Sequence, residues 1–352
     1  MNHKTKTLVI LTPGFAKDES DSTCLPMQQS FIRYLNKMFP HLKIIILAFQ
    51  YPYIKKTYKW HGNKVISFSG RNRGGISKLF LFQKWNAALK KIHKENKIDG
   101  LLSFWYTECA LVGKRFADKY NVKHYCWMWG QDAKKGNKYI SLTRLKPDEL
   151  VVFSDFMQDE FEKNYGFRPL HIITPGIDVK EFSFNNDKKD IDIIAAGSLI
   201  PLKQYDIFVQ VIGEIKKQFP LIKVVLIGDG PEKNKLQSLI KSSGLQSNIT
   251  LIGELSHPEV LQWMQRTKIF LHPSSYEGFG IVCIEALYSG AEVISFVKPM
   301  HNKIENWHIV KDKEEMIQKA AEILSTSKTE YKRIVPYTIE QTVQKIAKLF
   351  SV

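Results

Sequence analysis

The sequence predicts an α/β protein made of two Rossmann-like domains that face each other across a cleft. Short apolar runs typical of buried strands alternate with helical patterns along most of the 352 residues, and this alternation is typical of parallel sheets. It is interrupted by a stretch with Pro, Gly, Asn and charged residues, 175–190, which has neither helical nor strand periodicity. We therefore expect one domain before this linker and one after it.

In the first domain, strands and helices follow one another from the opening run onward. Ligands of open parallel sheets bind at the carboxyl ends of the strands. Gly14, residues 130–132 and Ser154 fall at such ends, and Gly14 could let the backbone approach a ligand or simply make a turn. The predicted strands are 7–12, 43–49, 99–104, 123–129, 149–154 and 170–174, and the predicted helices are 27–38, 77–95, 108–120 and 155–165.

The second domain repeats the alternation, and a last helix extends it. Thr338 is a candidate cap for this helix, which we expect to run through Phe350 and to cross back to the first domain. The predicted domains are thus 1–182 with 338–352, and 183–337. The predicted strands are 192–196, 222–227, 248–252, 268–271 and 291–296, and helices are expected within 205–219, after Pro231, and at 254–266, 281–288 and 313–324.

Composition points to an anionic partner. The net charge is +16, which favours a membrane surface, nucleic acid or phosphorylated substrates. No apolar run reaches membrane-spanning length, and the opening run is too short for a signal-peptide core. The four cysteines lack metal-site spacing and the density of a disulfide scaffold. We expect a cytoplasmic protein, peripheral on the inner face of the membrane.

The basic charge is concentrated in residues 51–98, where Glu95 is the only acid. Residues 77–95 have an amphipathic pattern with lysines beside apolar side chains. This pattern suits a helix on a membrane surface, and it suits a core-facing helix with a solvated basic back equally well. The apolar residues at helical spacing are Leu79, Phe82, Trp85, Leu89 and Ile92.

The stretch 272–295, HPSSYEGFGIVCIEALYSGAEVIS, combines a strand end, a glycine turn and a helix. Glu277 lies in the turn and Glu285 in the helix, eight residues later. A helix N-terminus between them carries partial positive charge and free N–H groups, which bind phosphate. Two acids around such a turn suit a nucleotide sugar, although the turn could also be an ordinary connection. The residues that offer these amides are Gly278, Phe279, Gly280 and Ile281.

This stretch resembles the E-x7-E motif of glycosyltransferase family 4, the group 1 glycosyl transferases, including the EGFG turn and the following EAL. The segment GSLIPLKQYD (197–206) resembles the family's GRL-x-x-x-K-G, and LIGDGPEKNKL (226–236) resembles its GDGP turn. TPGIDVKEF (174–182) and VVFSDFM (151–157) also resemble family segments. The resemblance covers the second half well and the first half in patches. It implies the GT-B fold and transfer of a sugar from a nucleotide donor to an acceptor hydroxyl, with retention.

The resemblance also assigns roles to individual residues. Lys203 falls on the lysine that holds the donor diphosphate, and Ser198 stands where the family has arginine, which weakens the expected diphosphate binding. Gly is replaced by Gln at position 204. In WGQDA (129–133), Asp132 is a candidate contact for a sugar hydroxyl or a helix cap. Glu277 would orient the donor sugar and Glu285 the ribose.

The implied mechanism is a front-face displacement without metal, and a double displacement stays an alternative. The one Asp-x-Asp, residues 190–192, leads into a strand and is interpreted as structural. We expect a UDP- or GDP-sugar donor, a sugar or lipid-linked acceptor, no cofactor, and a role in cell-surface polysaccharide or glycolipid synthesis. The alternatives are a nucleotide-sugar-binding protein without transfer, an epimerase of similar fold, and a nucleic-acid-binding protein, for which zinc spacing and aromatic RNA-binding motifs are missing.

Overall fold

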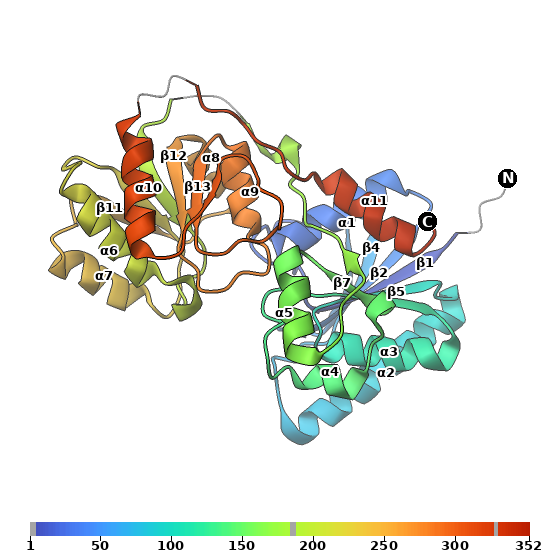
Figure 1. Ribbon diagram of the computed structural model, residues 1–352. Helices are drawn as coiled ribbons and strands as arrows, with labels where there is room; N and C mark the ends of the chain where they lie inside the picture. Colours follow the sequence, from blue (N-terminus) through green and yellow to red (C-terminus); the bar gives the residue numbers. More distant parts are fainter. Residues whose placement is uncertain (1–4, 184–187, 327–329) are drawn as a thin grey trace. The chain divides into compact units, whose positions relative to one another are not determined.

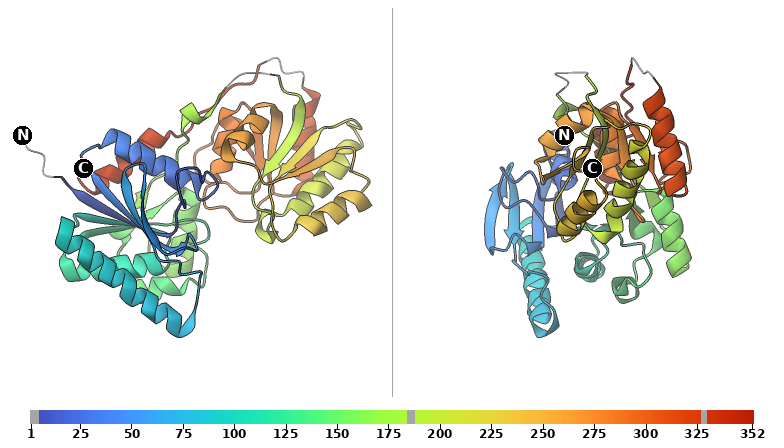
Figure 2. Two further views of the ribbon diagram at one scale, coloured as in Figure 1. Left: turned by 180° about the vertical axis from the view of Figure 1, so that it is seen from behind. Right: turned by 90° about the vertical axis from the view of Figure 1, so that its left-hand side faces the viewer.

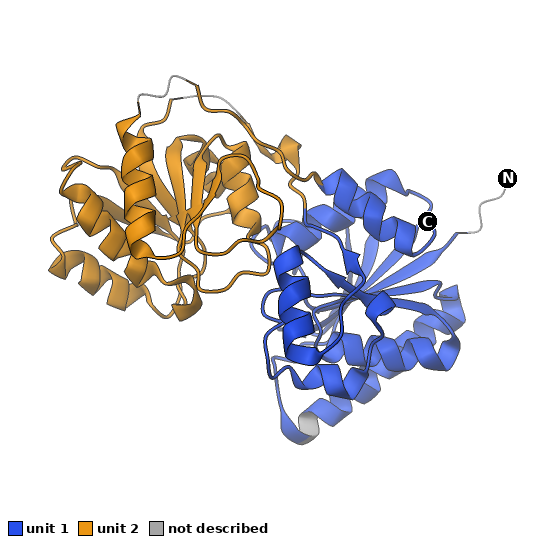
Figure 3. Cartoon of the chain, in the orientation of Figure 1, with its two compact units in different colours: residues 1–175, 339–352 blue, residues 176–338 orange. Residues whose placement is uncertain are grey.

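The computed structural model describes residues 5–183, 188–326 and 330–352. The chain divides into two compact units, one of residues 1–175 with 339–352 and the other of residues 176–338 (Figure 3). Each unit holds one sheet. The prediction of two Rossmann-like domains is confirmed, and each unit is described by itself.

Unit 1 contains, among its described residues, an eight-stranded sheet in the order β3-β4-β2-β1-β5-β6-β7-β8. All neighbouring strands are parallel except β3 and β4, which form an antiparallel hairpin. The strands are β1 Thr7–Gly14, β2 Lys43–Tyr51, β3 Lys56–Trp60, β4 Asn63–Ser67, β5 Gly100–Phe104, β6 Lys123–Trp127, β7 Leu150–Val152 and β8 His171–Ile172.

Helices cover this sheet, and the last helix of the chain is one of them. In α11, Ile339, Val343 and Ile346 are fully buried, and Figure 1 shows α11 beside α1 in unit 1. The predicted crossing of the last helix to the first domain is therefore confirmed. The helices are α1 Pro26–Met38, α2 Gly75–Asn96, α3 Glu108–Tyr120, α4 Lys138–Thr143, α5 Asp155–Tyr165 and α11 Ile339–Leu349.

The long helix α2 faces the core of unit 1. Trp85 is fully buried and stacks on Phe49, with ring centroids 4.1 Å apart, and Leu89 is buried in the same cluster. The core-facing interpretation of the amphipathic pattern is therefore correct for these positions. Leu79 and Phe80 differ, because they are 65% and 58% exposed on the first turns of α2, which extend past the rest of unit 1 (Figures 1 and 2).

Sequence patterns did not predict the hairpin of β3 and β4. Its two-residue turn, His61 and Gly62, has positive φ at both positions, as such hairpins require. In β3, the exposed side chains of Thr57 and Lys59 alternate with the less exposed Lys56, Tyr58 and Trp60. Because lysines occur on both faces, the hydrophobic pattern of the sequence did not show this period of two. Two further short elements, α4 and the strand β14 (Trp307–Ile309), were also not predicted.

Unit 2 contains, within the described part of the chain, a six-stranded parallel sheet in the order β11-β10-β9-β12-β13-β14. Helix α6 packs with α7 and α10, and α8 packs with α9. The strands are β9 Ile191–Ala196, β10 Val224–Ile227, β11 Ile249–Gly253, β12 Thr267–His272, β13 Glu292–Ser295 and β14 Trp307–Ile309; the helices are α6 Tyr205–Lys216, α7 Lys233–Ser242, α8 His257–Gln265, α9 Ile281–Tyr288 and α10 Lys313–Ser325.

The boundary between the units falls after Pro175, whereas the sequence placed it after Phe182. The segment between them packs on unit 2: Ile177 forms a β-bridge with Thr338. The Phe182 ring lies edge-on against Tyr288 of α9, with centroids 4.7 Å apart. These contacts, and not the linker-like composition, determine to which unit the segment belongs.

The strand order of unit 2 reverses direction between β9 and β12, which makes a topological switch point there. The chain enters at β9 in the middle, continues to β10 and β11 on one side, and returns to place β12 on the other side of β9. The loops that follow β9 and β12 therefore leave the sheet in opposite directions. Such a switch point is where open α/β sheets bind ligands.

Candidate functional site

The loop after β9 is held by the glycine turn after β10. The Gly197 N–H donates to the Ile227 carbonyl (3.0 Å) and the Leu199 N–H donates to the Asp229 carbonyl (2.9 Å). Gly228 has φ +144°, and a Cβ there would lie 2.0 Å from the Gly197 carbonyl oxygen. The two backbones thus approach so closely that only glycine fits at this turn.

A second set of bonds joins this loop to the loop after β12. The backbone N–H of Ser275 donates to the Leu202 carbonyl (3.0 Å), beside the short 3-10 turn Pro201–Lys203. The Lys203 ammonium then lies 2.5 Å from Oε2 of Glu277. Two residues 74 positions apart in sequence therefore meet at the switch point.

Glu277 is ionised in this setting. Burial alone would raise its pKa, but the hydrogen bond from His272 and the charge of Lys203 outweigh burial and hold the pKa at about 2. His272 Nε2 lies 3.3 Å from Oε2, the same oxygen that faces Lys203. Within the described ranges, Oε1 has no protein partner, so it is available to a ligand hydroxyl.

The turn between the two acids leads directly into α9. Gly280 is the N-cap of α9 with φ +86°, and a Cβ at this residue would lie 3.3 Å from Cys283 Sγ and 3.4 Å from Glu277 Cγ. Amides of the first turn of a helix have no intrahelical acceptors, and the helix dipole favours an anion there. Of the predicted anion-binding residues, Ile281 begins α9 and Gly280 is its N-cap, whereas Gly278 and Phe279 precede the cap.

Glu285 lies one turn further along α9 and has a partner that sequence reasoning missed. His257 Nε2 lies 2.8 Å from Glu285 Oε1, and His257 Nδ1 lies 3.4 Å from Oε2 of Glu181. The signal in the sequence was weak: a histidine at the first position of α8, four residues after the end of β11. Only the packing of α8 on α9 brings it to Glu285.

The predicted residues of unit 1 are placed at strand ends. Gly14 is the last residue of β1 rather than part of the following loop. Asp132 is buried, and its Oδ2 accepts N–H groups from Tyr106 (2.7 Å) and Trp129 (2.9 Å), so it ties two loops together and caps no helix. Burial raises its pKa to about 7. Contact of Gly14 and Asp132 with a ligand stays a prediction, as does that of the exposed Ser198 in unit 2.

The Asp-x-Asp carboxylates are occupied by ion pairs. Asp190 pairs with Arg266 through two bonds, the shorter 2.6 Å, and Asp192 pairs with Lys268 at 2.8 Å. Both act structurally, as expected. No group of three His, Cys, Asp or Glu side chains suited to a metal occurs among the described residues, and a reaction that needs no metal stays a prediction.

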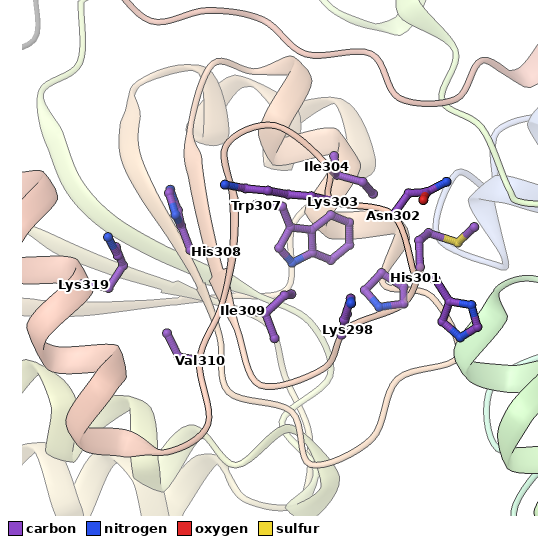
Figure 4. Close-up of a pocket in the computed structure, with 12 residues that line it drawn as sticks. Lys298, His301, Asn302, Lys303, Ile304, Trp307, His308, Ile309, Val310 and Lys319 are labelled. Atoms are coloured by element: carbon purple, nitrogen blue, oxygen red, sulfur yellow. The ribbon is translucent and has the colours of Figure 1, made fainter.

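Unit 2 also contains a cavity of about 390 Å³ that no sequence pattern indicated. Trp307 separates it from the glycine turn, because the indole also lies against Phe279, with ring centroids 6.1 Å apart. In Figure 4 the side chains of Lys298 and Lys303 lie on either side of Trp307. The lining is mostly basic and apolar: Lys298, Pro299, Met300, His301, Asn302, Lys303, Ile304, Trp307, His308, Ile309, Val310 and Lys319.

Because Glu277 is ionised against its neighbours, we expect a pH-dependent stability. The folded pKa of about 2 lies below the ordinary 4.5, so the stabilisation is present above pH 4.5 and is lost as the pH falls toward 2. Glu277→Gln should lower the free energy of unfolding at pH 7 by about 2 kcal/mol. Melting curves of wild type and variant should converge between pH 4.5 and 2, and a pH-independent difference would contradict the assignment.

Comparison with known proteins supports the interpretation of unit 2. Residues 177–341 match the family model described as "Glycosyl transferases group 1". These residues cover nearly the same range as unit 2, and they include Lys203, Glu277 and Glu285. The family match therefore concerns the unit that carries the site.

Two curated relatives and one solved structure are similar to the chain. An uncharacterized glycosyltransferase of Methanocaldococcus jannaschii is 26% identical over 212 residues, which is 58% of this chain and 58% of the relative. The phosphatidylinositol N-acetylglucosaminyltransferase gpi3 subunit of Schizosaccharomyces pombe is 35% identical over 108 residues, 31% of this chain and 24% of that protein. The chain thus spans less than two thirds of either relative.

The solved structure is that of the Anabaena protein HepE in complex with UDP and glucose. It superposes with a TM-score of 0.67 at 15% identity, covering 97% of this chain and 95% of that one. At this identity the likeness establishes the fold, which is GT-B. Residues 177–341 therefore match the group 1 glycosyl transferase family model, within a chain of GT-B fold.

Proposed function

We propose that the chain is a retaining glycosyltransferase that moves a sugar from a UDP- or GDP-sugar to an acceptor hydroxyl. The observation that carries the proposal is the meeting of Lys203 and Glu277 at the switch point of unit 2, beside the helix N-terminus of α9. The lysine and the backbone amides suit a diphosphate, and the two carboxylates suit the hydroxyls of a hexose and a ribose. HepE, of the same fold, binds UDP and glucose, which supports a nucleotide-sugar donor.

In the proposed reaction, the bond between the anomeric carbon and the leaving phosphate oxygen breaks while the acceptor oxygen bonds to the same face of that carbon. The acceptor proton passes to the departing phosphate, so charge balances without another base. Lys203 and the amides of Gly278 to Gly280 stabilise the phosphate as its charge grows. Oε1 of Glu277 orients a donor hydroxyl. The inference of retention is tested by the anomeric configuration of the product.

Thermal shift with UDP, GDP, ADP and their sugars tests the donor site. A ligand at one hundred times its Kd adds about 2.7 kcal/mol of stability, which is easily detected. We expect one nucleotide family to stabilise the protein, and an acceptor screen by mass spectrometry to detect transfer. Stabilisation by none would refute the donor site, and conversion of the nucleotide sugar into its epimer without transfer would indicate an epimerase.

The acceptor is proposed to be a sugar or a lipid-linked sugar at an anionic membrane, within cell-surface polysaccharide or glycolipid synthesis at the cytoplasmic face. Exposed Leu79 and Phe80 on the projecting turns of α2, with basic residues 84, 90 and 91 further along it, suit insertion beside anionic headgroups. The relative named for phosphatidylinositol is consistent with a lipid acceptor. No helix in the described ranges is both long and apolar enough to cross a bilayer.

We expect the double substitution Leu79→Ser and Phe80→Ser to weaken binding to phosphatidylglycerol vesicles more than tenfold. Each buried apolar side chain of this size contributes about 1.5–3 kcal/mol. Vesicle cosedimentation measures the effect, and Leu221→Ser, at a residue of unit 2 that is 90% exposed, is the matched control. Equal binding by all three proteins would contradict the proposed surface.

A further inference from the structure

His257 is held between two carboxylates at the start of α8. Its Nε2 lies 2.8 Å from Glu285 Oε1, and its Nδ1 lies 3.4 Å from Glu181 Oε2. Ionised carboxylates only accept hydrogen bonds, and a neutral imidazole has one donor nitrogen and one acceptor nitrogen. Both nitrogens can face carboxylates favourably only when the ring is protonated. With both carboxylates ionised, the geometry therefore favours an imidazolium.

The electrostatic setting agrees with this geometry. Burial opposes a charge on His257, but the charge of Glu285 and the bond with Glu181 outweigh burial and raise the pKa of His257 to about 10. The three side chains are 21%, 13% and 24% exposed, so water screens them only in part. At neutral pH the ring is a fixed cation beside Glu285.

This cation restricts how Glu285 can bind a ligand. Oε1 accepts from His257, which holds the carboxylate in one orientation. In the described part of the chain, Oε2 of Glu285 has no protein partner. A vicinal diol can then donate to Oε2 and to the remaining lone pair of Oε1, without rotation of the carboxylate on binding.

We propose that His257 is a positioning residue that orients Glu285 toward the ribose diol of the donor, so that the site selects ribonucleotides over deoxyribonucleotides. This rests on the proposed donor role of Glu285. Glu181 secures the other side of the ring. It comes from the short turn Val179–Glu181, so the segment that follows unit 1 contributes to the ribose end of the site.

Selection of ribonucleotides follows because the Glu285 carboxylate is already oriented before the ligand binds. A site built to bind a hydroxyl discriminates against an analogue that lacks it, because its polar groups are left unpaired. Here the groups are partly exposed, so we expect UDP to bind about 10–100-fold more tightly than 2′,3′-dideoxy-UDP. Without His257, Glu285 can rotate away or pair elsewhere, and the preference should shrink to a few-fold.

Calorimetric Kd values for these two nucleotides, on wild type and three variants, test the proposal. His257→Leu should weaken the binding of UDP about tenfold and leave the binding of dideoxy-UDP unchanged. His257→Gln keeps one N–H donor, so it should retain part of the preference for UDP. The control is His308→Leu, which removes a similar pair, His308 Nε2 to Glu292 Oε2 at 2.7 Å. It should bind both nucleotides as wild type does.

Three failures are distinguishable. If His257→Leu weakens both nucleotides equally, or weakens neither, the positioning role is overturned while the donor site stands. If wild type binds UDP and dideoxy-UDP alike, ribose selection is overturned. If wild type binds no ribonucleotide diphosphate, with GDP and ADP also tried, the proposed function fails and this inference fails with it. If UDP is inactive but GDP or ADP binds, the same comparison uses that nucleotide and its dideoxy analogue.

Discussion

Replacement of Lys203 by alanine should lower kcat/KM for sugar transfer by about 100–1,000-fold, the usual effect of removing one electrostatic stabiliser of a transition state. Lys203 is the cation at the switch point that is expected to face the diphosphate, and Ser198 replaces the second cation that the resemblance leads one to expect. The leaving phosphate would then depend on the turn amides alone. Steady-state kinetics with the donor found by thermal shift measures the loss.

The control for this variant is Lys268→Ala. Lys268 also forms an ion pair with a carboxylate, Asp192 at 2.8 Å, but it lies at the start of β12, at the end of this strand opposite the site. Loss of this pair should change kcat/KM less than about threefold, because partly exposed pairs contribute little. If the two variants lose activity equally, Lys203 contributes to folding rather than to phosphate stabilisation.

Substitution of Gly228 by alanine should be the most destabilising single change in unit 2. The new Cβ would lie 2.0 Å from the Gly197 carbonyl oxygen, and φ of +144° strains any other residue. The loop that carries Lys203 must then move away from the turn after β10. We expect a loss of about 3 kcal/mol or more, which lowers the melting temperature by roughly 6–12 °C.

Gly244→Ala separates the two causes of this loss. Gly244 has φ +64°, and a Cβ added to it would meet no heavy atom within 4 Å. Only the backbone conformation therefore opposes alanine there, at about 1–2 kcal/mol. Calorimetry of both variants should show a clearly lower melting temperature for Gly228→Ala than for Gly244→Ala. Similar melting temperatures would mean that the Gly197 loop yields easily, and that close packing of the two turns does not define the site.

Local patterns in the sequence determined the elements of this protein. Periodicity and turn residues predicted helices 108–120 and 155–165 with the bounds that α3 and α5 have. The strand, glycine turn and helix around Glu277 were predicted as they occur, because each of these elements depends on residues that are close together in the sequence. Alternation of strands and helices predicted parallel sheets, and the resemblance predicted that Lys203 and Glu277 act together.

Tertiary structure decided which side chains meet. The 2.5 Å contact of Lys203 with Glu277 arises because β12 returns beside β9, and the charged role of His257 arises because α8 packs on α9 against Glu181. Packing contacts, such as that of Phe182 on Tyr288, also placed residues 176–182 with unit 2. Such contacts join residues far apart in the chain, and their energies depend on burial and distance, which only the folded arrangement defines.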